Sequence, residues 1–184
     1  MAFAEAAGAY CQKHGGTVQT QQPTFGTNNG ESTWVALGQP VQVCQFQSGT
    51  GANNSRIYTD LITLYSEQPT LAALAYLAKK KTSTTSNGAN PATAGCTALG
   101  ASTAFGPSLN GGGLVDKESK ADPVVSPCTF ADGSFIDEWG IAYYSGGVVR
   151  GADLAPLFRF DKATVPKVFS QQESRLRVRP GPRG

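Results

Sequence analysis

The sequence predicts an α+β fold made of two pseudo-repeated units, each a helix, a small antiparallel sheet and a following helix, with one disulfide per unit. The four cysteines form two pairs of nearly equal spacing: Cys11 and Cys44 are 44 − 11 = 33 positions apart, and Cys96 and Cys128 are 128 − 96 = 32 apart. Each second cysteine begins a Cys-x-Phe-x-x-Gly motif. An internal repeat of this kind indicates the architecture before any element is assigned.

Disulfides Cys11–Cys44 and Cys96–Cys128 follow from this symmetry. A unit of roughly 75–85 residues has only a marginal hydrophobic core, so covalent staples are expected, and each bridge would contribute about 3–4 kcal/mol in the chain-entropy model. Structural zinc needs closely spaced ligand pairs, which this chain lacks, so we expect no metal and no cofactor. Four separate buried thiols are the alternative. Disulfides predict an oxidising compartment, hence a periplasmic or secreted protein.

In the first unit, residues 1–80, the pattern predicts helices and strands in alternation. Gly15-Gly16 ends the first helix, and apolar residues at helical spacing after Ser55 predict a second. Pro69 suits the start of a third helix. The expected elements are helix 3–13, strands 17–22, 33–37 and 41–46 around a loop at 23–32, a helix from 55 to 66, and a helix at 70–80.

The second unit, residues 91–158, repeats this order after a polar linker at 81–90. Asn90 is expected to cap a helix that begins at Pro91. The turn Asp132-Gly133 leads into a final helix. The remaining elements are a strand at 102–105, a Gly-rich loop at 106–123, a strand at 124–130, the helix at 135–144, and an extended basic C-terminal arm at 159–184.

Residues 90–145 resemble a known bacterial domain. The sequence Asn90-Pro-Ala, then Cys96, then Cys128-Thr-Phe-Ala-Asp-Gly-Ser and Glu138-Trp139 is similar to the hemolysin-type small domain of periplasmic proteins and lipoproteins, a family of uncharacterised function. The first copy, 5–66, resembles it only through its cysteines, glycines and Cys-x-Phe motif. The family's further cysteine is absent here, so the resemblance implies one bridge per unit and an extracytoplasmic location.

Few residues suggest catalysis. The single histidine, His14, follows a helix, where a capping or surface role is expected, and no Gly-x-Ser-x-Gly elbow accompanies it. Asp137, Glu138 and Trp139 form a candidate patch in the second unit, although acids at a helix start also suit its dipole. The face shared by Trp139 and Tyr143 is expected in the core, with a ligand platform as the alternative.

Charge is distributed unevenly. Residues 159–184 hold seven basic and two acidic residues, 7 − 2 = +5, which leaves 2 − 5 = −3 for residues 1–158. The arm lacks interleaved aromatics, so we expect no nucleic-acid binding.

No apolar run is long enough to span a membrane, and no leader is visible at the start, where we expect one to have been removed. The candidate partner-binding residues are Trp34, Arg175, Arg177, Arg179 and Arg183.

The sequence therefore predicts a non-catalytic extracytoplasmic module that binds a protein partner or forms part of a larger assembly. The alternative is a secreted hydrolase, or a hydrolase inhibitor, that works through the patch of Asp137, Glu138 and Trp139. A shared structural role would place equivalent residues in both copies, whereas this patch occurs in one.

Overall fold

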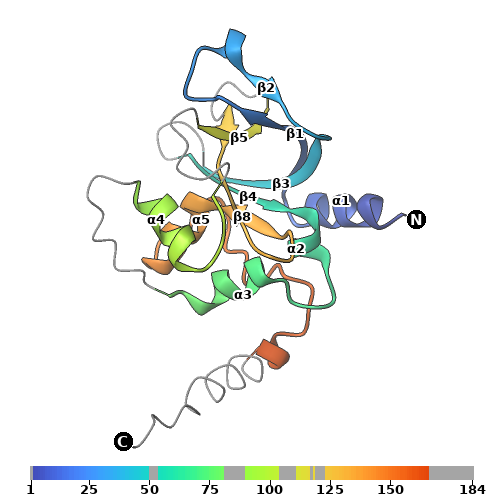
Figure 1. Cartoon of the computed structure of the whole chain (residues 1–184). Helices are drawn as coiled ribbons and strands as arrows, with labels where there is room; N and C mark the ends of the chain where they lie inside the picture. The colour runs from blue at the N-terminus through green and yellow to red at the C-terminus, as the bar shows by residue number, and fades with distance from the viewer. Residues whose placement is uncertain are drawn as a thin grey trace, which may run out of the picture.

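The structure is a computed structural model that describes residues 2–49, 54–80, 90–103, 111–116, 118 and 123–165. Within these ranges the helices and strands are mixed along the chain (Figure 1). The strands are β1 (Thr17–Phe25), β2 (Val35–Ala36), β3 (Val41–Ser48), β4 (Ser55–Asp60), β5 (Gly112–Val115), β6 (Val124–Val125), β7 (Pro127–Thr129) and β8 (Phe135–Asp137). The α-helices are α1 (Phe3–Lys13), α2 (Leu61–Tyr65), α3 (Leu71–Ala78), α4 (Pro91–Ala98) and α5 (Glu138–Ser145), and short 3-10 turns lie at Glu31–Thr33 and Lys162–Thr164.

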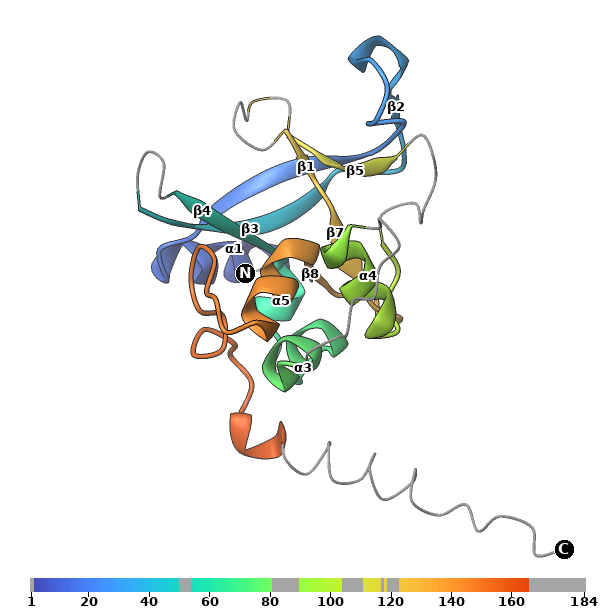
Figure 2. The ribbon, with the colours of Figure 1, turned by 90° about the vertical axis from the view of Figure 1, so that its left-hand side faces the viewer.

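One antiparallel sheet contains all of these strands, in the order β6-β5-β1-β3-β4-β8-β7, with β2 beside β1. The long strand β1 pairs with β3 over residues 17–21 and with β5 over residues 22–25. The two ends of the order, β6 and β7, are separated in sequence only by Ser126. The sheet therefore curls into a nearly closed barrel, with α3, α4 and α5 gathered on one side of it (Figures 1 and 2).

The two halves of the chain share this sheet. Strand β1 of the first half pairs with β5 of the second, and β4 pairs with β8 through Thr59 and Ile136. The mixed helix-and-sheet class is confirmed, but the two separate small sheets expected from the sequence are one sheet. Each small sheet would expose unpaired backbone groups along its edges, and joining the sheets satisfies those groups. The expected linker lies outside the described residues, apart from Asn90.

Two segments predicted as helices begin as strands. The stretch from Ser55 forms β4 before the short helix α2, and the stretch after Ser134 forms β8 before α5. The prediction was wrong because the last four residues of β4 are all buried, as are all three of β8. A strand covered on both faces lacks the apolar–polar alternation by which strands are recognised.

Other predicted elements agree more closely with the structure. Helix α1 has the predicted bounds, α3 lies within the predicted range, and Asn90 caps α4 by accepting the backbone N–H of Ala92 at 2.9 Å. The loop expected at 106–123 contains β5, whose glycines allow close strand contact: a Cβ at Gly113 would lie 2.7 Å from the carbonyl oxygen of Val125. The strand expected at 124–130 is divided into β6 and β7.

The core has two parts. The larger cluster packs the helices against one face of the sheet and contains both predicted disulfides, Cys11–Cys44 and Cys96–Cys128. These bridges tie α1 to β3 and α4 to β7. The smaller cluster fills the inside of the curled sheet, and its members are Val43, Tyr58, Leu114, Val125 and Phe135.

The start of the predicted arm belongs to the folded body. Phe160 and Val165 are buried in the larger cluster, and the rings of Phe158 and Phe160 stack with centroids 5.6 Å apart. The arm was expected to be extended from residue 159, but Phe160 and Val165 pack on the main body, which supplies their apolar partners. Residues 166–184 lie outside the described residues.

Candidate functional site

The acidic part of the predicted patch points into the protein. Asp137 ends β8 and caps α5: its Oδ1 accepts the N–H of Gly140 at 2.7 Å, and its Oδ2 accepts the N–H of Tyr58 at 2.8 Å. Only 6% of Asp137 is exposed. Its carboxylate therefore joins β8, α5 and β4, which is a structural position.

Glu138 is buried beside it. The hydroxyl of Thr93 on α4 donates to Glu138 Oε2 at 2.9 Å. Burial raises the pKa of Glu138, and the neighbouring charge of Asp137 raises it further, while the Thr93 hydrogen bond opposes the shift. Acid groups with raised pKa occur at active sites but also in structural networks. Here the contact joins α5 to α4.

Asp60 is a third buried acid, and the sequence interpretation gave it no role. Its Oδ1 accepts the N–H of Thr63, which caps α2, and its Oδ2 accepts the N–H of Phe135 on β8. Burial raises its pKa, and these hydrogen bonds oppose that rise. A signal was present: an aspartate directly before a short apolar run is a common N-cap.

The Asp-Gly-Ser part of the repeated motif caps a distant helix. Asp132 Oδ2 accepts the N–H of Leu71 at 2.8 Å, and the hydroxyl oxygen of Ser134 accepts the N–H of Ala72 at 3.0 Å. Both donors are at the start of α3. The hydrogen bonds to Asp132 hold its pKa below the usual value even though partial burial acts in the opposite direction.

The aromatic part of the patch is exposed. Trp139 and Tyr143 are 36% and 43% exposed, with their ring centroids 5.7 Å apart. The guanidinium of Arg150 lies 5.2 Å from the Tyr143 ring centroid. Val148, whose N–H donates to the Tyr143 carbonyl, and Val149 are about half exposed. We call Trp139, Tyr143, Val148, Val149 and Arg150 the α5 surface.

The expectation that Trp139 and Tyr143 lie in the core was therefore wrong. Residues four apart on a helix share a face, but on α5 the face that packs inward carries Ile141 and Tyr144. The ring centroids of Tyr144 and Tyr76 are 3.8 Å apart, and the two rings stack. Tyr144 therefore has the core position that was expected for Trp139 and Tyr143. Because α5 is apolar on both faces, its sequence does not indicate which one is buried.

Trp34 lies in the connection between β1 and β3, which projects from the barrel near β2 (Figure 1). It is partly exposed, and its indole N–H donates to the carbonyl of Asn29 at 2.9 Å. Val35 and Leu37 beside it are also exposed. The other candidate partner-binding residues, Arg175, Arg177, Arg179 and Arg183, lie outside the described residues.

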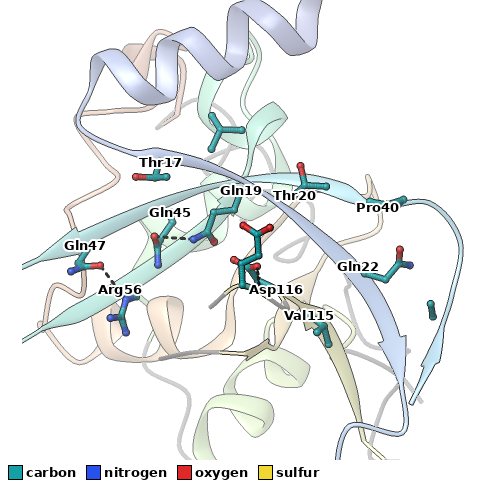
Figure 3. Close-up of a pocket in the computed structure, with 13 residues that line it drawn as sticks. Thr17, Gln19, Thr20, Gln22, Pro40, Gln45, Gln47, Arg56, Val115 and Asp116 are labelled. Carbon is teal, nitrogen blue, oxygen red and sulfur yellow. Dashed lines mark hydrogen bonds between the residues drawn. The ribbon is translucent and has the colours of Figure 1, made fainter. Parts of the chain in front are cut away.

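A polar pocket of about 1060 Å³ was not predicted. It is bounded by β1, β3, β4 and the chain that follows β5 (Figure 3). Glutamines at every second position of β1 and β3 were the sequence signal, since such positions share one face of a strand. Its charged lining residues are Arg56, Asp116 and Glu118, and the amides of Gln19, Gln45 and Gln47 lie among them.

Two of the glutamine amides that line the pocket, those of Gln19 and Gln45, belong to a hydrogen-bonded row. Gln21 Nε2 donates to Gln19 Oε1, and Gln19 Nε2 donates to Gln45 Oε1, each at 3.1 Å. Gln45 Nε2 then donates to the Tyr58 hydroxyl at 2.9 Å. Gln21 is fully buried, and its Oε1 has no partner in the described part of the chain. Since each amide has two donor hydrogens and an oxygen with two lone pairs, the wall retains capacity to bind a polar ligand.

His14 is the C-cap of α1, as predicted, with its ring Nδ1 2.8 Å from the Tyr10 carbonyl oxygen.

Among the described residues, no group of three or more His, Cys, Asp or Glu side chains is arranged to hold a metal ion. None of the described helices is both long and apolar enough to cross a membrane.

No protein family, curated protein or solved structure matches the chain.

Proposed function

We propose that this protein is a non-catalytic extracytoplasmic module, periplasmic or secreted, that binds a protein partner through the α5 surface. The observation that carries the proposal is the exposed pair Trp139 and Tyr143, with Arg150 against the Tyr143 ring. Trp, Tyr and Arg are the residue types that most often dominate binding energy at protein interfaces. Val148, whose N–H donates to the Tyr143 carbonyl, and Val149 add two exposed apolar side chains to this group.

The rigidity of the α5 surface supports the same proposal. Asp137 caps α5, Glu138 joins it to α4, and Tyr144 stacks on Tyr76 in the core. The two exposed rings are therefore carried by a helix whose position is held by these three contacts. A rigid surface loses less conformational entropy on binding than a flexible one.

The buried acids favour binding over the alternative of a hydrolase that works through Asp137 and Glu138. Both carboxylates accept hydrogen bonds from the protein itself and are at most 6% exposed. A general acid or base must reach a substrate proton within hydrogen-bonding distance. In this arrangement, the exposed member of the patch is Trp139.

The two disulfides support an extracytoplasmic location, because such bridges persist in oxidising compartments. The resemblance of residues 90–145 to the hemolysin-type domain agrees with that location.

We also propose that the chain arose from two copies of one unit, since Asp60 and Asp137 occupy corresponding places where a strand meets a helix. The basic segment containing Arg175 is proposed as a second contact with the partner.

Affinity capture with the full chain as bait tests the α5 surface. Extract from the native extracytoplasmic compartment is passed over the wild type, over Trp139→Ala/Tyr143→Ala, and over the control Ile62→Ala/Leu71→Ala, which alters exposed apolar residues elsewhere. A partner should be recovered about 30-fold less by the first variant, as expected from losing about 2 kcal/mol at an interface hot spot. Equal recovery by all three baits would contradict the proposal.

A further inference from the structure

Within the described part of the chain, strand β1 has an open edge beside the polar pocket. Its residues 22–25 pair with β5, but no described strand pairs with residues 17–21 on that same side. The N–H of Gly26 donates to Gly111 on the β5 side, while the carbonyl of Pro23 accepts from Leu37 on the opposite side. Successive residues of a strand direct their backbone N–H and C=O groups to alternate sides. Pro23 directs its carbonyl away from β5, so the even-numbered residues Val18 and Thr20 direct their backbone groups to the open edge.

The pocket lies along this edge. Val18 and Thr20 line it together with Thr17 and Gln19, and Thr20 is exposed. Asp116 and Glu118, which follow β5, also line it (Figure 3). An unpaired edge of this kind is a template for an added strand.

We infer that the edge of β1 binds an extended peptide by strand addition, and that this peptide carries basic residues at alternate positions. An added strand places every second side chain on the pocket side, next to Gln19, Asp116 and Glu118. There a lysine or arginine would meet the two acids. The side chains in between would face the same side as Val18, which packs against the larger core cluster, and aliphatic residues suit that position.

The chain's own sequence contains such an alternation. Arg175-Leu-Arg-Val-Arg179 places a basic residue at every second position with aliphatic residues in between. Strand addition would supply main-chain hydrogen bonds, and the alternating side chains would supply specificity. A peptide of this sequence is therefore a suitable probe. The site is separate from the α5 surface, so the two proposals can fail independently.

The test uses the full chain and a synthetic peptide of residues 171–184. Peptide binding should slow amide hydrogen exchange at Val18 and Thr20 at least tenfold, while Trp139→Ala/Tyr143→Ala leaves this effect unchanged. The variant Asp116→Asn/Glu118→Gln should weaken binding about fivefold, the range of partly exposed ion pairs. A control peptide has the same composition, with Arg175, Arg177 and Arg179 moved to consecutive positions.

If the chain's own segment already fills the edge, the two amides are protected without added peptide and lose that protection in Leu176→Pro/Val178→Pro. That result supports strand addition equally, because proline removes the backbone donors the added strand would use. Two results would overturn the proposal: equal binding of both peptides, or unchanged exchange at Val18 and Thr20 in every sample. Equal binding would indicate charge attraction without strand pairing.

Discussion

Asp60 and Asp137 each bind the strand that carries the other. Asp60 Oδ2 accepts the N–H of Phe135 at 2.6 Å, two residues before Asp137, and Asp137 Oδ2 accepts the N–H of Tyr58 at 2.8 Å, two residues before Asp60. Each aspartate also caps the helix that follows it. The contact between β4 and β8 has one described backbone pair, Thr59 with Ile136. The two carboxylates therefore contribute much of the connection between β4 and β8.

Asp137→Ala should destabilise the fold by about 3 kcal/mol, because it leaves the buried N–H groups of Tyr58 and Gly140 without their acceptor and removes a helix cap. Urea unfolding followed by circular dichroism measures the loss. Asp137→Asn keeps one side-chain oxygen and should lose less. Equal stability of wild type and Asp137→Ala would show that the carboxylate does not hold β4 and α5.

Glu138→Gln should change how stability depends on pH. Burial raises the pKa of Glu138 in the folded state above 4.5, its ordinary value. A raised pKa gives stability that is present below the unfolded pKa and is lost as pH rises through the folded pKa. Glutamine can still accept from Thr93 but does not ionise, so the variant should match wild type near pH 4 and exceed it at pH 7. Thermal unfolding across this range checks the sign, and a constant difference would contradict it.

Cys96→Ser/Cys128→Ser should destabilise the isolated protein by about 3–4 kcal/mol, since the bridge closes a loop of 32 residues between α4 and β7. Cys11→Ser/Cys44→Ser removes a loop of 33 residues and is the matched comparison. Denaturant midpoints of the two variants should lie close together. Peptide mapping of the oxidised wild type should recover both pairs and no cross-pairing.

Gly140→Ala should destabilise by about 1–3 kcal/mol through overpacking. A Cβ at this position would lie 2.6 Å from Ile57 Cγ1 and 2.8 Å from Asp137 Oδ2, and both neighbours are buried. At Gly30 a Cβ meets nothing within 4 Å and φ is −60°, so Gly30→Ala is the control. If the two variants have the same thermal midpoint, α5 does not pack closely on β4.

Phe160→Ala should cost about 3–4 kcal/mol, because the side chain is 3% exposed and stacks on Phe158. Ile62→Ala removes an apolar side chain that is 56% exposed and should change stability by less than about 0.5 kcal/mol. Chemical unfolding of the two variants makes the comparison. If the two variants were about equally stable, residue 160 would not belong to the folded body, and the start of the arm would lie at residue 159 as the sequence predicted.

Local signals predicted much of the fold. The cysteine spacing gave both bridges, Asn90-Pro91 gave the start of α4, and Gly15 gave the end of α1. These features depend on neighbours a few residues away or on an internal symmetry. They can therefore be recognised without knowledge of the tertiary structure.

Long-range pairing could not be predicted in the same way. The sequence of β4 does not reveal that β8 covers its edge, so Ile57 was assigned to a helix. Trp139 and Ile141 are both apolar, and only the position of α4 and α3 decides which of them is buried. The pocket could not be predicted because its glutamines lie on two strands, and only the pairing of β1 with β3 brings them together.

The double pairing of β1 has a consequence for the order of folding. This strand leaves a ribosome or a translocation pore well before β5, its partner over residues 22–25, which follows about ninety positions later. The Cys11–Cys44 bridge can form once β3 has emerged, whereas the sheet cannot close until β8, at Phe135–Asp137, has also arrived. Contacts so distant in sequence slow folding. During synthesis, the chain should therefore pass through a species oxidised at Cys11 and Cys44 in which residues 22–25 still lack their second neighbour.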